Sequence, residues 1–188
     1  MSMLRFSVLA CSLLLPFTAV HAQDNLNVAR YSTANELLYP ASLDTWIQTG
    51  ASIGGEYNDK PFDPQHPGTI GVVQMEPNAY HYFMEHKSYA EGTMFLLSFY
   101  QAEGKSDPQL PGFVQGALVS QEIHVLDKSR FSQGQGHGFF IFRTPQQETA
   151  SEIPSPNPCV TCHMEHGKFN GTFAQFYPAL RAKLGLGK

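Results

Sequence analysis

The sequence predicts an α+β domain, with helices packed against a mostly antiparallel β-sheet. Runs rich in Val, Ile, Leu, Phe and Thr are separated by clusters of glycine and proline, a pattern typical of strands joined by turns. The segments before the C-terminal region lack the long 3.6-residue periodicity of a helical bundle. With 188 residues, of which 42% are hydrophobic and 15% are charged, the chain is long enough for one domain with its own core.

Four strands and four helices are expected. The strands are residues 69–75, 93–101, 113–127 and 138–143. The helices are residues 36–46, 78–86, a segment around 159–163, and 173–184. Pro178 is expected to kink or restart the last helix, because proline has no backbone N–H to donate. A segment rich in acidic residues and proline, 145–158, connects the last strand to the C-terminal helices.

The first 22 residues resemble a secretory signal peptide. A short cationic start precedes an apolar stretch over 6–20, and Val20-His21-Ala22 places small residues at the −3 and −1 positions of a cleavage site. The apolar stretch is shorter than the roughly 20 helical residues that span a bilayer. We therefore expect cleavage after Ala22, export to a bacterial periplasm and a mature domain over 23–188 without a membrane span. An N-terminal anchor, or a lipid on Cys11, is the alternative.

The most informative motif is Cys159-Val160-Thr161-Cys162-His163, the attachment signature of a c-type haem. Two thiols three positions apart on one helical turn can each add to a vinyl group of the same porphyrin. The next residue, His163, is then placed to supply a nitrogen ligand to the iron. The motif predicts one covalent haem c, with Cys159 and Cys162 as attachment points and His163 as the metal ligand on a C-terminal haem-binding helix.

Three other interpretations of the two cysteines compete with haem attachment. A redox-active dithiol prefers a junction between a strand and a helix, and the proline-rich segment 154–158 is a poor end for a central strand. A disulfide between Cys159 and Cys162 would stabilise little, because the loop it closes is small. A zinc site would add His163 and His166 to the two thiols, whereas structural zinc usually draws on two separated pairs of ligands.

The position of the motif restricts the sixth iron ligand. Only 25 residues follow His163, and the one methionine among them, Met164, is its neighbour and cannot reach the opposite face of a porphyrin. The upstream candidates are Met75, Met84, Met94, His66, His81, His86, His124 and His137. An iron left open on one side suits the binding of a small molecule better than electron transfer. A six-coordinate electron-transfer cytochrome is the alternative.

Segments spread along the chain resemble the cytochrome P460 family, which includes the cytochromes c′-beta. The matching segments, in order, are Glu36-Leu37-Leu38-Tyr39-Pro40 with Trp46 and Gly50, Met75-Glu76-Pro77, Gly92-Thr93, Val125-Leu126-Asp127 with Arg130-Phe131, residues 139–142, the haem motif, and Phe173 with Phe176-Tyr177-Pro178 and Leu180-Arg181. The resemblance implies a mostly antiparallel β fold, a homodimer and a c-type haem with an open distal side. Members either oxidise hydroxylamine with a lysine cross-linked to the porphyrin or, in the c′-beta type, bind nitric oxide or similar small ligands.

Individual positions resemble the c′-beta type more closely. The cross-linking lysine of the family corresponds to Leu97, five residues after Gly92, and leucine has no amine to form that bond. A distal arginine of the family corresponds to Gly71, and a tryptophan corresponds to His137, whereas a distal glutamate is retained as Glu122. The resemblance therefore implies Leu97 in the distal pocket and Glu122 as a proton carrier beside the iron.

The preferred functional hypothesis is a periplasmic haem protein that binds nitric oxide or a similar diatomic ligand. Hydroxylamine or other nitrogen-oxide redox chemistry, with Glu122 carrying the proton, is the enzymatic alternative, and a redox partner protein is then expected. Alternation along 117–125 places Glu122 and His124 on the strand face opposite Ile123, without showing whether that face lines a pocket or meets solvent. The net charge of −4 and the lack of basic runs argue against a nucleic-acid partner.

Overall fold

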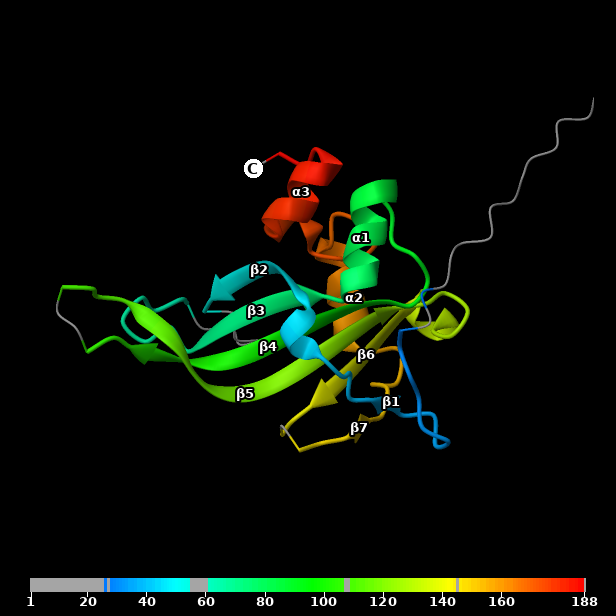
Figure 1. Ribbon diagram of the computed structural model, residues 1–188, viewed down its shortest axis with the longest axis horizontal. Coiled ribbons are helices and arrows are strands. Elements are labelled where there is room, and N and C mark those ends of the chain that lie inside the picture. Colours follow the sequence, from blue (N-terminus) through cyan, green and yellow to red (C-terminus); the bar gives the residue numbers. More distant parts are fainter. Residues whose placement is uncertain (1–25, 27, 55–60, 107–108, 145, 188) are drawn as a thin grey trace, which may run out of the picture.

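The computed structural model describes residues 26, 28–54, 61–106, 109–144 and 146–187, and the predicted signal peptide over 1–22 lies outside these residues. Its architecture is α+β, as the sequence predicted (Figure 1). The main sheet is antiparallel, with five strands in the order β2 (Ile47–Ile53), β3 (Thr69–Met75), β4 (Thr93–Gly104), β5 (Phe113–Leu126) and β6 (His137–Phe142). A separate pair joins β1 (Leu37–Leu38) to β7 (Thr149–Ala150).

The helices are short and lie outside the sheet. The α-helices are α1 (Pro77–His86), α2 (Pro158–His166) and α3 (Pro178–Leu184), and the 3-10 helices are η1 (Leu43–Thr45), η2 (Ser132–Gly134) and η3 (Ala174–Phe176). In Figure 1, α1 and α3 stand above the β2 edge of the sheet, whereas β1 and β7 lie below β6. No helix in the described ranges is both long and apolar enough to cross a membrane.

The two faces of the main sheet contact different parts of the chain. On one face, Met94, Leu96, Ile123 and Phe140 are almost fully buried in a cluster with residues of the N-terminal segment, among them Leu37. The opposite face carries the alternate residues of the same strands, and part of it packs on helices. The members of that second cluster are Val73, Met75, Ala79, Phe83, Tyr89, Phe95, Leu126, Ala174 and Leu180. The rest of this second face is left for the cavity described below.

The predicted helix over 36–46 is wrong. The structure has β1 and η1 there, separated by Pro40, whose missing N–H prevents a continuous helical hydrogen-bond ladder. Leu37 pairs with Ala150 and is fully buried, so contacts with a distant segment determine the local conformation. The other three predicted helices are confirmed, with the last one divided at Pro178 into η3 and α3.

The four predicted strands are confirmed, and β2 is an additional strand that the sequence patterns missed. Its residues, Ile-Gln-Thr-Gly-Ala-Ser-Ile, have little of the apolar alternation of a strand. The register to β3 also shifts between Gln48 and Gly50. At Gly50 an added Cβ would lie only 2.7 Å from Cδ1 of Tyr177, so a larger residue would clash with the segment that leads into α3. This edge strand is thus shaped by tertiary contacts.

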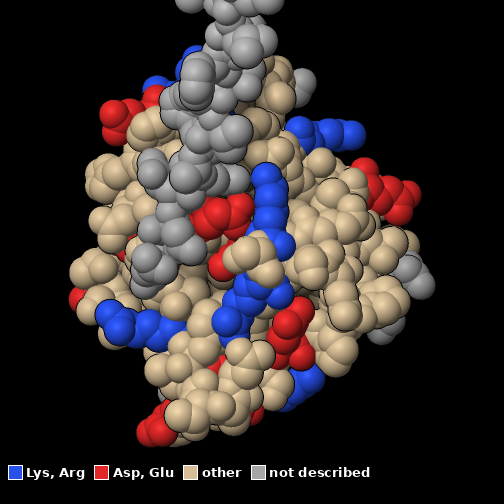
Figure 2. Space-filling view, turned by 90° about the vertical axis from the view of Figure 1, so that its right-hand side faces the viewer, with Lys and Arg blue, Asp and Glu red and all other residues tan. Residues whose placement is uncertain are grey.

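Charged side chains of both signs lie close together on the face shown in Figure 2. Arg130 places its guanidinium carbon 3.3 Å from the centre of the Tyr31 ring and donates a hydrogen bond to Asn35. Glu91 accepts a hydrogen bond of 2.6 Å from the backbone N–H of Lys128. In Figure 2, blue and red groups lie next to one another, so this face does not form a surface of one sign.

Candidate functional site

The cysteine-containing motif lies on α2, and the start of this helix is fixed by its own sequence. Pro158 occupies the first turn, where the N–H that it lacks would have no helical partner. Asn157 caps the helix by accepting a hydrogen bond of 2.9 Å from the N–H of Val160, and its amide donates to the carbonyl oxygen of Ile153 at 3.0 Å. Asn157 is itself buried. The cap thus holds the motif in a defined position relative to the chain that precedes it.

A cavity of about 450 Å³ lies between α2 and the second face of the main sheet. Its wall is mostly apolar, and the lining residues are Val73, Phe95, Leu97, Glu122, Ile123, His124, Phe139, Ile141, Pro158, Cys159, Cys162, His163, Thr172, Phe173 and Tyr177. All five residues singled out from the sequence, Leu97, Glu122, Cys159, Cys162 and His163, therefore line one cavity. The volume is within the range of about 300–1,000 Å³ that is common for sites of small molecules and cofactors.

The imidazole of His163 has a defined hydrogen-bond partner. Nδ1 lies 2.8 Å from the carbonyl oxygen of Gly171, and because a carbonyl only accepts, Nδ1 carries the proton. The carbonyl belongs to a turn in which Asn170 and Gly171 both have positive φ, 44° and 61°. Nε2 is then the unprotonated nitrogen of the neutral ring, and burial lowers the pKa of His163. The Nε2 lone pair is therefore available to bind a metal ion.

The His163 ring packs against three other aromatic rings. The centroids of Phe173, His124 and Phe139 lie 4.6, 4.7 and 4.8 Å from the His163 centroid. The interplanar angles of 61°, 74° and 61° are those of tilted or edge-on contacts. These contacts restrict rotation of the ring.

His124 is hydrogen-bonded to a second buried histidine, His137. Nε2 of His124 lies 2.8 Å from Nδ1 of His137, and the two side chains are only 8% and 5% exposed. Burial lowers the pKa of His137 to about 4 and that of His124 well below its usual value, so both rings are neutral at pH 7. This pair was not predicted, because His124 lies in the predicted strand over 113–127, whereas His137 comes just before the predicted strand over 138–143. In the structure β6 begins at His137, which brings both histidines onto one sheet face.

Leu97 and Glu122 are directly opposite each other on β4 and β5. Val73 on β3 and Ile141 on β6 continue the same row across the sheet. Among the described residues that line the cavity, Glu122 is the one carboxylate. The pKa of Cys159 is raised first by burial and second by the negative charge of Glu122. This side of the cavity is accordingly apolar except at Glu122. The strand face that carries Glu122 therefore lines a cavity, a point that the alternation of the sequence left open.

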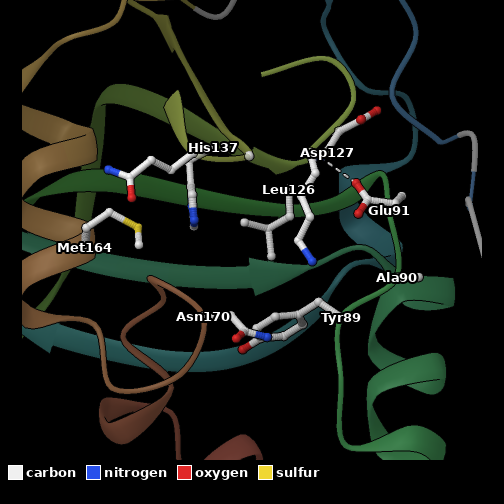
Figure 3. Close-up of a pocket in the computed structure, with 11 residues that line it drawn as sticks. Tyr89, Ala90, Glu91, Leu126, Asp127, His137, Met164 and Asn170 are labelled. Atoms are coloured by element: carbon white, nitrogen blue, oxygen red, sulfur yellow. Dashed lines mark hydrogen bonds between the residues drawn. The ribbon is translucent and has the colours of Figure 1, made fainter. Parts of the chain in front are cut away.

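Gly71 and His137, two further positions compared with the family, also lie near the cavity. A Cβ added at Gly71 would be 3.4 Å from Cδ1 of Leu97, so this position adjoins the cavity wall. His137 lines a smaller cavity of about 170 Å³, where Figure 3 shows its ring with the side chains of Met164 and Asn170 around it. The His124–His137 pair therefore separates the two cavities.

Residues 45–174 match the sequence profile of the Cytochrome P460 family. The matched segment begins at η1, continues through the whole main sheet and includes the complete motif on α2. The chain belongs to the cytochrome P460 family. It is accordingly a c-type haem protein. A comparison with curated proteins found no match to this sequence.

The residues around the larger cavity of this P460 family member fit a c-type haem. Two free thiols, Cys159 and Cys162, and the unprotonated nitrogen of His163 lie on one helix beside an apolar cavity. The zinc alternative fits less well, because the side chain of His166 is 60% exposed and lines a surface groove with Glu165 and Cys162, whereas His163 lines the larger cavity. Among the described residues, no group of three or more His, Cys, Asp or Glu side chains is placed to hold a metal ion.

Among the eight candidates for a sixth iron ligand, only His124 lines the larger cavity. The ring of His124 is in direct contact with that of His163, so no porphyrin fits between them. Met75 and Met94 are buried in the two core clusters, and His66 is exposed beside Asp63. None of the eight side chains therefore enters the cavity opposite His163.

Proposed function

We propose that this cytochrome binds nitric oxide or a similar small diatomic ligand at a single haem whose distal side is open. The observation that carries the proposal is the lining of the larger cavity. His163 packs against His124 and Phe139. The neighbouring row of the sheet, which consists of Val73, Leu97, Glu122 and Ile141, contains no methionine or histidine. An iron with only one protein ligand is suited to binding a small molecule.

The proposed cofactor site uses three side chains of α2. Cys159 and Cys162 would form thioether bonds to the porphyrin, and Nε2 of His163 would bind the iron while Nδ1 donates to Gly171. When bound, the haem supplies an iron that binds diatomic ligands reversibly. The role of the chain is to orient the ligating ring and to surround the iron with an apolar wall.

The apolar wall favours uncharged ligands. Moving an anion from water into an apolar cavity is unfavourable unless a cation or hydrogen-bond donors compensate for the lost hydration. Leu97 and Gly71 stand at or beside the cavity where the family resemblance implies a lysine and an arginine, so this chain has neither cation there. We infer a preference for nitric oxide over anionic ligands.

The proposal includes export and assembly. Residues 1–22 would act as a signal peptide, and the haem would be attached to the mature domain over 23–188 in the periplasm. The family resemblance supports a homodimer, and a redox partner protein would set the oxidation state of the iron. An intact mass of the exported chain that begins at Gln23 would support this part of the proposal.

The ferrous protein is expected to have a high-spin, five-coordinate haem, because none of the upstream candidates enters the distal part of the cavity. Optical and resonance Raman spectra of the purified protein measure the coordination number. Added imidazole provides a six-coordinate, low-spin reference in the same protein. A low-spin spectrum without imidazole would contradict ligand binding and support electron transfer.

Hydroxylamine oxidation is the second candidate function, and the position of Glu122 favours it. A carboxylate in the wall of an otherwise apolar cavity is placed to accept a proton from a bound substrate. Leu97, directly opposite, has no amine for the cross-link that the hydroxylamine-oxidising members use. Glu122 thus favours hydroxylamine oxidation and Leu97 argues against it. A measurement of hydroxylamine turnover distinguishes the two functions.

We expect no hydroxylamine turnover above that of free haem, because Leu97 cannot be cross-linked. The measurement is anaerobic reduction of an electron acceptor by the purified protein in the presence of hydroxylamine. Turnover that decreases in Glu122→Gln, but not in the control Glu103→Gln on the exposed part of β4, would instead establish the enzyme. Equal turnover in both variants and in free haem would agree with the ligand-binding proposal.

A further inference from the structure

We propose that His124 and His137 act together as positioning residues that fix the orientation of His163 and of the carbonyl to which it donates. This inference rests on the proposed role of His163 as the iron ligand. It concerns two side chains that would not touch the iron themselves. Their effect would be transmitted through the ring of His163 and through the turn at Gly171.

The first part of the argument is the contact between His124 and His163. The two rings are 4.7 Å apart and nearly perpendicular, at 74°. His124 is itself held between Phe139, 4.4 Å away in a nearly parallel stack, and His137. A rotation of His163 about its side-chain bonds would therefore displace His124 from this stack.

The second part is the contact between His137 and the turn at Gly171. A Cβ added at Gly171 would lie 2.6 Å from Cε1 and 2.9 Å from Nε2 of His137, so the glycine packs directly against this ring. The Gly171 carbonyl is the acceptor for Nδ1 of His163. His124 thus touches the donor ring, His137 touches the acceptor residue, and one hydrogen bond of 2.8 Å joins the two histidines.

The third part is the rigidity of the elements that carry the pair. His124 is paired with Phe139, and His137 with Leu126, in the ladder between β5 and β6. The hydrogen bond between the histidines is therefore a diagonal cross-strand contact on one sheet face. An unbonded ring nitrogen buried at this position would be unfavourable, so the pair has one preferred arrangement. Two phenylalanines would fill the space without that directional preference.

The test compares two amides at each histidine position. The amide of asparagine lies where Nδ1 of histidine lies, and the amide of glutamine lies where Nε2 lies. At position 137, His137→Asn keeps a bond to His124 and His137→Gln loses it, because Nδ1 is the bonded atom. At position 124 the order is reversed, because Nε2 is the bonded atom, so His124→Gln keeps the bond and His124→Asn loses it.

The readout is the iron–histidine stretching band in the resonance Raman spectrum of the ferrous holoprotein. We expect a band close to that of the unmodified protein in His137→Asn and His124→Gln, and a shifted, broader band in His137→Gln and His124→Asn. The affinity for nitric oxide is expected to change about 10-fold in the second pair of variants. His81→Gln, on the exposed side of α1, is the control and should change neither quantity.

Reversal of the amide order between the two positions is the decisive result, since a general loss of packing would not reverse it. The same band in the asparagine and glutamine variants at both positions would overturn the inference. If a variant at one position does not retain haem, the comparison of asparagine with glutamine at the other position still tests the inference. An unmodified protein with no iron–histidine band at all would instead overturn the proposed function.

Discussion

Replacing Cys159 and Cys162 together with serine is expected to abolish covalent haem completely. A serine hydroxyl does not add to a porphyrin vinyl group under the conditions in which thiols do, so neither bond can form. Both thiols are free and line the larger cavity, which is where the porphyrin is proposed to bind. The measurement is the intact mass of the denatured protein after production in a host with haem-ligation machinery.

The control for this experiment is Thr161→Ser, which changes a residue between the two cysteines on the same turn of α2. This variant should carry the full mass of one haem, because the hydroxyl of Thr161 donates to the carbonyl of Asn157, at 3.3 Å, and serine can do the same. Each single cysteine variant should retain one of the two covalent bonds. A haem adduct on the double variant would refute the proposed attachment sites.

Leu96→Ala is expected to lower the free energy of unfolding by about 2–5 kcal/mol, the second large effect. Leu96 is fully buried in the cluster on the first face of the sheet, where the lost methyl groups leave a void. Leu110→Ala provides a matched control, because Leu110 is 63% exposed and its truncation should change stability by no more than about 0.5 kcal/mol. Denaturant unfolding of the two variants measures both values.

The same variant also tests the separation of the two sheet faces. Leu96 points away from the cavity, whereas its neighbour Leu97 lines it. We therefore expect Leu96→Ala to keep the optical spectrum of the unmodified protein at temperatures where it is folded. A changed coordination number in Leu96→Ala would show that the two faces are not independent.

Most of the fold could be predicted because strand patterning dominates this sequence. The predicted range 69–75 agrees with β3 at both ends, and the runs that form β4, β5 and β6 were found with small differences at their ends. The N-terminal region was harder, because Leu37 is buried through pairing with a segment more than a hundred residues away. The conformation of β2 depends on Tyr177 in the same way. Local sequence patterns contain no record of such contacts.

The candidate site could be predicted in part. The motif identified Cys159, Cys162 and His163 directly, and the family register placed Leu97 and Glu122, which the structure brings into the same cavity. The acceptor for His163, a backbone carbonyl, has no side-chain identity that a sequence pattern could reveal. The His124–His137 bond is diagonal across two strands, so its detection needed the exact pairing of β5 with β6.

The alternation of β4 has a consequence for how such a protein can diversify. Leu96 and Ser98 face the first sheet face, while Leu97 between them faces the larger cavity. A mutation at position 97 can therefore replace a hydrocarbon by an amine without disturbing the neighbours that keep the strand in place. The chemistry of the cavity wall at this position and the packing that stabilises the strand are therefore set by side chains on opposite sides of one backbone.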